Sequence, residues 1–294
     1  MKTTTLSLIR TGILIAAMLL GTLSCKKDSS SSQSADEQTT IDLAGSSTGA
    51  ESLYDDAFDV VVQGSEESGV SVNSTAGLTV NSTGESLASY TAVACATVTL
   101  SPQDPSVFPK TMTIDYGDGC TSVNGITRKG KLVVTLSGKV RTPGSTISVT
   151  FDNYSVNGYT LTGTYALTPV AGTGGGVNYT VAITNGSITL PSGAAYTYSA
   201  DETFTQTGGI GTPDVTDDTY EITGDFTYSG NGNTITGTVT NPLIRTADCK
   251  NITSGTISFV YKGLNGTLDF GSGTCDNIAT VKVGVKTSTI TLPR

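Results

Sequence analysis

Histidine and tryptophan are absent from this 294-residue chain, and charged residues account for only 14% of it. The absence of histidine excludes Ser-His-Asp and Cys-His catalytic arrangements, and it also excludes the usual zinc sites. Acidic residues outnumber basic ones, which gives a formal net charge of −9 and a pI of about 4.4. Such an acidic chain argues against nucleic acid and anionic membrane surfaces as partners, because both attract basic surfaces.

Glycine and threonine are abundant instead, and the glycine count alone is 35. Threonine favours β-strands, and glycine supplies the backbone conformations that tight turns need. From about residue 87 onward, short strand-like segments alternate with turn residues. The sequence therefore predicts an all-β fold, an antiparallel meander of hairpins over residues 87–294. This meander forms a β-sandwich or a curled half-barrel, with one short N-terminal helix.

The segment 49–68 has the spacing of an amphipathic helix. Four residues at positions i, i+4, i+5 and i+8 form an apolar stripe: Leu53, Ala57, Phe58 and Val61. Asp55, Asp56 and Asp59 are expected to face away from this stripe. We interpret the segment as a helix docked on the β domain, with a partner-binding helix as the alternative.

The first 24 residues have the form of a lipoprotein signal peptide. A positively charged start precedes the uncharged stretch Thr11–Leu23, which is too short to cross about 30 Å of hydrocarbon as a helix. The sequence "TLSC" at residues 22–25 resembles a bacterial lipobox and predicts lipidation of Cys25. The polar, Ser-rich residues 25–48 then predict a flexible tether.

These features predict that the partner of the N-terminus is a membrane, held through the lipid anchor. Lys26 follows the cysteine. An aspartate at that position resembles an inner-membrane retention signal, so its absence favours the outer membrane. The cell-surface face and the periplasmic face both remain open.

The remaining four cysteines predict two disulfides, because an even number in an exported chain argues for pairing. Cys95 and Cys120 are 25 residues apart, and Cys249 and Cys275 are 26 residues apart. This matched spacing favours the pairs Cys95–Cys120 and Cys249–Cys275. Each bridge would close the end of one long hairpin.

Asn-Gly pairs at residues 157–158, 185–186 and 265–266 predict two-residue hairpin turns. Asparagine and glycine tolerate the two positive φ angles of a type I′ turn. The sequence of residues 157–169 is also similar to that of residues 231–242. This similarity suggests an internal duplication of one hairpin.

Two Gly-containing loops carry carboxylate pairs, Asp115 with Asp118 and Asp269 with Asp276. Oxygen ligands in such loops suit calcium, but the spacing matches no EF-hand. We therefore predict no metal and no cofactor, and interpret the loops as disulfide-closed hairpins, with calcium as the alternative.

The densest acidic region of the β domain consists of Asp201, Glu202, Asp217 and Asp218. Two carboxylates at a suitable separation would hydrolyse a glycoside. We interpret these residues as solvated turn residues instead. The sequence thus predicts no catalytic residues and no enzyme activity.

Three segments, Phe108–Gly138, Ile147–Thr164 and Gly266–Val283, resemble a group of uncharacterised Bacteroidota outer-membrane lipoproteins. The resemblance covers most of the chain after about Leu87, together with the lipobox. It implies an outer-membrane lipoprotein with a β-rich body, and it implies no catalytic residues.

We interpret the chain as a non-enzymatic surface or periplasmic module for binding or adhesion, with a glycan or a protein as its partner. Tyr196 and Tyr198 share one strand face and are candidate ligand-binding residues, since exposed tyrosines stack on sugar rings. Burial of both tyrosines in the core is the alternative. The alternative function is a periplasmic carrier of lipid or another hydrophobic ligand, built as a half-barrel with the helix in its concave face.

Overall fold

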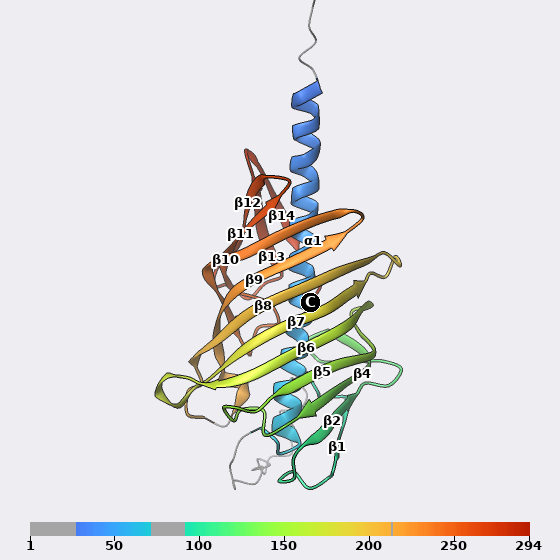
Figure 1. Ribbon diagram of the computed structural model, residues 1–294, viewed down its shortest axis with the longest axis vertical. Helices are drawn as coiled ribbons and strands as arrows, with labels where there is room; N and C mark the ends of the chain where they lie inside the picture. The colour runs from blue at the N-terminus through green and yellow to red at the C-terminus, as the bar shows by residue number, and fades with distance from the viewer. Residues whose placement is uncertain (1–27, 72–91, 213) are drawn as a thin grey trace, which may run out of the picture.

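A computed structural model describes residues 28–71, 92–212 and 214–294 of the chain (Figure 1). One long helix, α1 (Asp28–Glu67), precedes all the strands. The strands are β1 (Thr97–Ser101), β2 (Lys110–Asp115), β3 (Cys120–Thr121), β4 (Thr127–Leu136), β5 (Ile147–Val156), β6 (Tyr159–Ala171), β7 (Val177–Thr189), β8 (Ala195–Gly208), β9 (Thr219–Gly230), β10 (Asn233–Thr246), β11 (Ser254–Tyr261), β12 (Leu264–Ser272), β13 (Ile278–Val283) and β14 (Lys286–Thr291). Short 3₁₀ turns at Thr173–Gly175 and Val215–Asp217 lie between strands.

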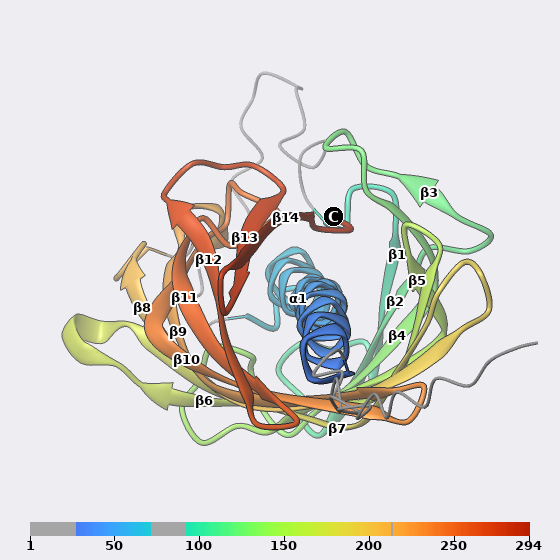
Figure 2. The same cartoon turned by 90° about the horizontal axis from the view of Figure 1, so that it is seen from above.

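The strands form a single 14-stranded antiparallel sheet in which neighbours in sequence are neighbours in space. The order runs from β1 through β2 and β4 to β14, and the short β3 pairs with β4 beside this path. Viewed along its axis, the sheet curls around α1 and leaves a gap between its β1 and β14 sides (Figure 2). The predicted all-β meander is confirmed, in the form of a curled sheet with the helix in its concave face.

Alternating side chains explain why these segments form strands with one dry face. Along β8, the even-numbered residues from Tyr198 to Gln206 are buried against the interior, and the odd-numbered residues between them face solvent. Many solvent-facing positions are threonines that pair across strands, as in Thr164↔Thr184 and Thr203↔Thr223. The convex face is therefore rich in hydroxyl groups, while the concave face is apolar and aromatic.

The apolar stripe predicted on the helix is confirmed, because Leu53, Ala57, Phe58 and Val61 are all buried. The three aspartates lie off this stripe, as expected, but the fold largely covers them too. Asp55 and Asp56 are buried, and the side chain of Asp59 keeps 16% of its exposure. The curled sheet surrounds this part of α1 on most sides, so the face opposite the apolar stripe is interior as well (Figure 2).

The predicted tether over residues 25–48 is wrong for residues 28–48, which form the first half of α1. Burial of Ile41, Leu43 and Ala44 holds this half against the sheet. Most of a helix's stability in proteins comes from such packing, so a Ser-rich segment with modest helix propensity is still helical here. No helix in the described part of the chain has both the length and the apolar character to cross a membrane.

The predicted turn at Asn157–Gly158 is confirmed. Val156 pairs with Tyr159, and both turn residues have positive φ angles. The similar segment forms an equivalent turn at Asn231–Gly232, where Gly230 pairs with Asn233. The two similar segments thus occupy equivalent hairpins, β5–β6 and β9–β10.

The other two Asn-Gly predictions are wrong. β7 continues through residues 185–186, where Asn185 has a φ of 52° and the pairing register shifts toward both neighbouring strands. This is a β-bulge, which uses the same positive φ as a turn. Near residues 265–266, the turn lies instead at Lys262–Gly263, so that Tyr261 pairs with Leu264.

Both predicted disulfides are confirmed. Cys95 and Cys120 join the chain before β1 to β3, with their Cα atoms 6.2 Å apart. Cys249 and Cys275 join the β10–β11 connection to the β12–β13 connection, with a Cα separation of 5.7 Å. Each bridge therefore fixes loops near one side of the gap in the curled sheet.

Candidate functional site

One acid on α1 sits at the centre of a buried ionic network. Asp56 accepts hydrogen bonds from Nε and Nη2 of Arg128, at 2.9 and 2.6 Å, and from the Tyr154 hydroxyl at 2.6 Å. Arg294 Nη1 lies 3.3 Å from the same carboxylate. Burial alone would raise the pKa of Asp56, but Arg128 and Arg294 outweigh it and hold that pKa at about 2.

Arg294 links this network to the next turn of the helix. Its Nη1 atom also lies 3.1 Å from Asp59, which pairs in turn with Arg245 of β10. Five side chains therefore alternate in charge through the interior, and we call them the paired cluster: Arg128, Asp56, Arg294, Asp59 and Arg245.

The backbone around Arg294 is fixed as well. Asn157 donates its side-chain amide to the Pro293 carbonyl at 2.7 Å, and Asn251 donates to the Arg294 carbonyl at 3.3 Å. Asn157 belongs to the β5–β6 turn and Asn251 to the β10–β11 connection. Residues 292–294 therefore tie together two distant parts of the sheet and the helix inside it.

A second buried group, the acid cluster, consists of Glu51 and Asp55 on α1, Glu202 on β8, and the tyrosines Tyr165 and Tyr198. Glu51 Oε2, Asp55 Oδ2 and both tyrosine hydroxyls have no hydrogen-bond partner among the described residues. Buried polar atoms without partners are costly, by about 1–3 kcal/mol each. The unpartnered polar atoms of this cluster therefore lower the stability of the fold.

The pKa values in the acid cluster follow from its surroundings. Burial, reinforced by the charges of Asp55 and Asp201, raises the pKa of Glu202 to about 8. Burial also raises the pKa of Glu51 well above its ordinary value, with Glu202 and Asp55 adding to the effect. For Asp55, burial raises the pKa although Arg245 and Arg294 oppose it. Glu202 is accordingly mostly protonated at neutral pH.

The interpretation of the four acidic residues as solvated turn residues holds for Asp217, which is exposed in a 3₁₀ turn, whereas Asp201 is solvated but lies within strand β8. It is wrong for Glu202 and for Asp218. Asp218 is 2% exposed and pairs with Arg141 at 2.9 Å. The four carboxylates do not converge on one accessible site, because two lie inside and two lie outside.

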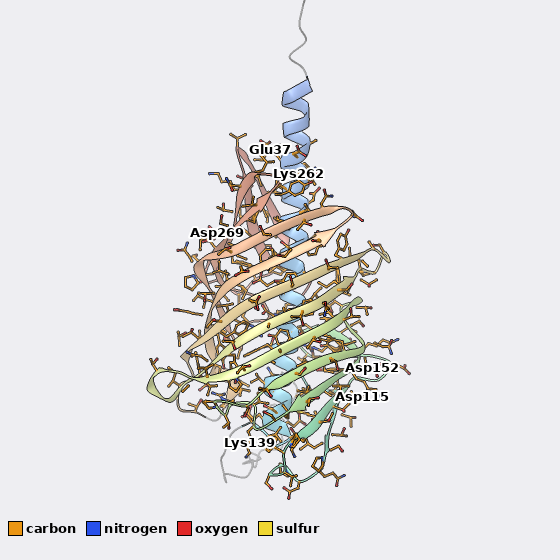
Figure 3. The ribbon with its side chains drawn as sticks, in the orientation of Figure 1. Glu37, Asp115, Lys139, Asp152, Lys262 and Asp269 are labelled. Atoms are coloured by element: carbon orange, nitrogen blue, oxygen red, sulfur yellow. A yellow bond between two sulfur atoms is a disulfide. The ribbon has the colours of Figure 1, made fainter. Side chains whose placement is uncertain are left out.

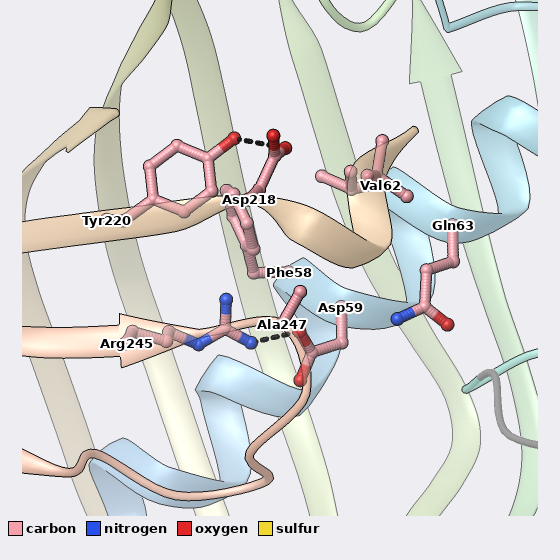
Figure 4. Close-up of a pocket in the computed structure, with 9 residues that line it drawn as sticks. Phe58, Asp59, Val62, Gln63, Asp218, Tyr220, Arg245 and Ala247 are labelled. Carbon is pink, nitrogen blue, oxygen red and sulfur yellow. Dashed lines mark hydrogen bonds and ion pairs between the residues drawn. The ribbon is translucent and has the colours of Figure 1, made fainter. Parts of the chain in front are cut away.

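A small pocket separates Asp218 and Tyr220 from the paired cluster (Figure 4). Phe58 and Val62 of α1 and Arg245 of β10 also line it. Its volume is about 10 Å³, which is about the space that one water molecule needs. This pocket is therefore too small for an organic ligand.

Of the two tyrosines predicted to bind a ligand, Tyr198 is buried, and the prediction for it is wrong. Its side chain is 1% exposed and stacks on Tyr54 of α1, with ring centroids 5.5 Å apart. Its ring also stacks on that of Phe226, with centroids 5.8 Å apart. Tyr198 is thus a core residue that joins the helix to the sheet.

Tyr196 lies in an open groove of about 420 Å³ where β8, β9 and β10 meet their turns. Its ring rests on Gly230, where any Cβ would overlap the ring atoms, and it stacks on Tyr228 with centroids 5.3 Å apart. Asn231 donates its side-chain amide to the Tyr196 hydroxyl at 3.2 Å. We call this the Tyr196 groove.

Hydroxyl groups form a row along the Tyr196 groove. The strand register places Ser187, Thr197, Ser229 and Thr234 side by side across β7 to β10, on the solvent-facing side of the sheet, whereas the Tyr196 ring packs toward the core on the other side. All four line the groove, and the hydroxyls of Ser229 and Thr234 are 2.8 Å apart. None of the nine residues that line the groove carries a charge. Such a surface suits a neutral ligand with many hydrogen-bonding groups.

The loops considered for calcium use their carboxylates locally. Asp115 accepts a hydrogen bond from the Gly117 amide and pairs with Lys131 at 2.9 Å. Asp269 accepts from the Gly271 amide in the same way. Among the described residues, no group of three or more His, Cys, Asp or Glu side chains is placed to hold a metal ion.

The signal peptide and the lipidated Cys25 lie outside the described residues. Sequence reasoning also missed the buried arginines of the paired cluster. A signal for them exists, since Arg128 is in phase with the buried Leu132 and Val134 along β4. Glu202 is likewise in phase with Ala200 and Phe204 along β8. A charged residue in the buried phase of a strand indicates a buried ion pair or a shared proton.

Comparison of the chain with known protein families, curated proteins and solved structures finds no match.

Proposed function

We propose that this protein is a lipid-anchored, non-enzymatic binding or adhesion module of the bacterial outer membrane, related to the Bacteroidota lipoproteins that it resembles. Its ligand is a neutral, hydroxyl-rich molecule such as a glycan, bound in the Tyr196 groove. The observation that supports this proposal is a contrast in accessibility. α1 fills the concave face, whereas the groove beside Tyr196 is open and has about 420 Å³ of space.

The chemistry of the groove supports a glycan as the ligand. The hydroxyl and amide groups along the groove both donate and accept hydrogen bonds, as a hydroxyl-rich ligand requires, and Tyr196 borders the groove. The non-enzymatic part of the proposal rests on the absence of histidine and on the enclosure of Glu202 and Asp218. An acid that is sealed inside the fold does not reach the glycosidic bond of a polymer.

The proposal is tested by affinity electrophoresis through gels that contain cell-wall or host polysaccharides. The wild-type protein should be retarded by at least one polysaccharide, and Tyr196→Ala should lose most of that retardation. Tyr159→Ala is the matched control, because Tyr159 is also partly exposed but lies at the β5–β6 turn. Equal retardation of the wild type and Tyr196→Ala, or no retardation by any glycan, would contradict the proposal. Release of new reducing ends during the assay would contradict its non-enzymatic part.

The membrane face is tested by protease treatment of intact cells. Release of peptides from residues 92–294, with periplasmic proteins left intact, would place the body on the cell surface and favour host or environmental glycans. Protection of those residues would place it in the periplasm and favour a cell-wall glycan.

A further inference from the structure

The end of the molecule where α1 emerges carries two hairpin tips (Figure 1). Lys262 in the β11–β12 turn lies 3.8 Å from Asp36, and Figure 3 shows it close to Glu37 at this end. Lys286, next to the β13–β14 turn, donates to the Ser34 carbonyl at 2.8 Å and lies 3.6 Å from Glu37. These contacts fix the tips at the level of residues 34–37 of the helix.

The β13–β14 tip exposes an apolar side chain to solvent. Val285 is 95% exposed, the highest value among the exposed large hydrophobic residues of the described chain. Lys282 and Lys286 flank it in sequence, and Lys282 is exposed on β13. An apolar apex with cationic side chains behind it is suited to the headgroup boundary of a bilayer, where lysines extend toward phosphates.

Distance along the chain indicates that this end lies nearest to a membrane. Cys25 is three residues before the start of α1 at Asp28, and three residues span at most about 10 Å. Ser34 lies about 9 Å further along the helix axis, and Glu67 is roughly 50 Å beyond Ser34. A body held by Cys25 therefore meets the bilayer with the tips at residues 34–37, and a tilt toward β13 and β14 brings Val285 into contact.

The distribution of charge also favours this end of the molecule as the one that faces an anionic membrane. The whole chain carries a net charge of −9 and is repelled by anionic lipid. Three lysines, Lys262, Lys282 and Lys286, outnumber the two acids Asp36 and Glu37 that pair with them at this end, and the side chain of Lys262 keeps 60% of its exposure. An excess of lysines near an anionic lipid surface is attracted to it. Repulsion elsewhere and attraction here together orient the body on the membrane.

We propose that the β13–β14 tip, with Val285 at its apex and Lys282 and Lys286 behind it, is the point at which the anchored protein contacts the headgroup region of a phospholipid bilayer. This inference rests on the membrane attachment in the proposed function. It adds an orientation, in which the N-terminal end of α1 faces the bilayer and the β1–β2 end faces away.

The test places an environment-sensitive fluorophore on Val285→Cys after the native disulfides have formed. Val107→Cys is the matched control, because Val107 is 45% exposed in the β1–β2 loop, near the far end of α1. The chain from residue 26, with an N-terminal histidine tag, is captured on phosphatidylglycerol vesicles that contain a nickel-chelating lipid. The capture fixes the anchor point whether or not Cys25 is lipidated.

The inference predicts that the emission of the label at position 285 shifts to shorter wavelength on capture. Spin-labelled lipids should quench it several-fold more strongly than the label at position 107. No shift at position 285, or an equal shift at both positions, would overturn the inference. Lipidation itself is read separately, from the mass of the N-terminal peptide of the full chain expressed in bacteria. Failure of the orientation and failure of the anchor are therefore distinguished.

Discussion

Asp56 and Glu51, buried acids on neighbouring turns of α1, have pKa values that are shifted in opposite directions. Asp56 and Asp59 each contact two arginines, and burial of Asp56 is compensated so well that its pKa falls to about 2. Glu51 and Asp55, less than two turns away, face Glu202 and have unpartnered oxygens. Burial alone therefore does not decide the state of a carboxyl group. Direct contact with arginine side chains does, since Asp56 has such contacts and the Asp55 carboxylate, although near Arg245 and Arg294, keeps an unpartnered oxygen.

Removal of the central acid of the paired cluster should have the largest effect. Asp56→Ala leaves Arg128 and Arg294 with uncompensated buried charge and deprives Tyr154 of its acceptor. We expect a loss of about 3–5 kcal/mol in the free energy of unfolding, measured by urea denaturation. The exposed Asp152→Ala is the control, with a change within about 0.5 kcal/mol. Equal stability of the two variants would contradict the role given to the paired cluster.

Removal of the shared arginine should cost less. Arg294→Ala leaves Asp56 with Arg128 and leaves Asp59 with Arg245, so each acid keeps one partner. We expect a loss of about 1–3 kcal/mol by the same measurement, because hydrogen bonds are lost but neither acid is stranded. A loss as large as that of Asp56→Ala would show that the network depends on Arg294 more than on either strand arginine.

The acid cluster should respond to pH in the direction opposite to a salt-bridged acid. The pKa of Glu202 is about 8 in the fold against an ordinary 4.5, so the folded state binds the extra proton between these values. Stability should therefore fall as the pH rises from about 4.5 to about 8. Glu202→Gln, which keeps the shape without the ionisation, should flatten this fall and be more stable than the wild type at pH 8. Parallel pH profiles for the two proteins would exclude a proton on Glu202 in the folded state.

The smallest effect is expected where an ion pair meets solvent. Lys262 and Asp36 lie 3.8 Å apart, with side chains 60% and 45% exposed. Asp36→Asn should change the free energy of unfolding by less than about 0.5 kcal/mol, because water screens the pair. A change above 1 kcal/mol would indicate that the N-terminal part of α1 is held by charge and not by packing.

Local sequence patterns predicted the β domain, both disulfides and the apolar stripe of α1, because alternation, cysteine spacing and helical period are short-range signals. They failed where the same dipeptide, Asn-Gly, occurs in two different backbone structures. Asn157–Gly158 forms a turn and Asn185–Gly186 forms a bulge, and both sites use a positive φ at asparagine. At the second site Gly186 leaves room for the Tyr198 backbone and the Tyr54 hydroxyl, so long-range packing decides the outcome.

The candidate site was predicted in part for the same reason. Tyr196 lies in an open groove, but Tyr198, two residues along the same face, is covered by α1. The sequence does not say where a helix covers a strand. It also does not pair Asp56 with Arg128 and Arg294, which lie 72 and 238 residues further along the chain.

In the proposed function, α1 stays in the concave face of the curled sheet as its permanent core, and the Tyr196 groove is left as the place for a ligand. Native-state hydrogen exchange of α1 amides between Ile41 and Val62 tests it most directly, by comparison with the amides of β7 and β8. If α1 never leaves the sheet, both sets of amides should exchange only through global unfolding, with the same free energy of opening. Exchange of the helix amides at a much lower free energy, with the strands still protected, would show that α1 leaves the concave face. That result would contradict the account and favour a carrier that opens for a hydrophobic ligand.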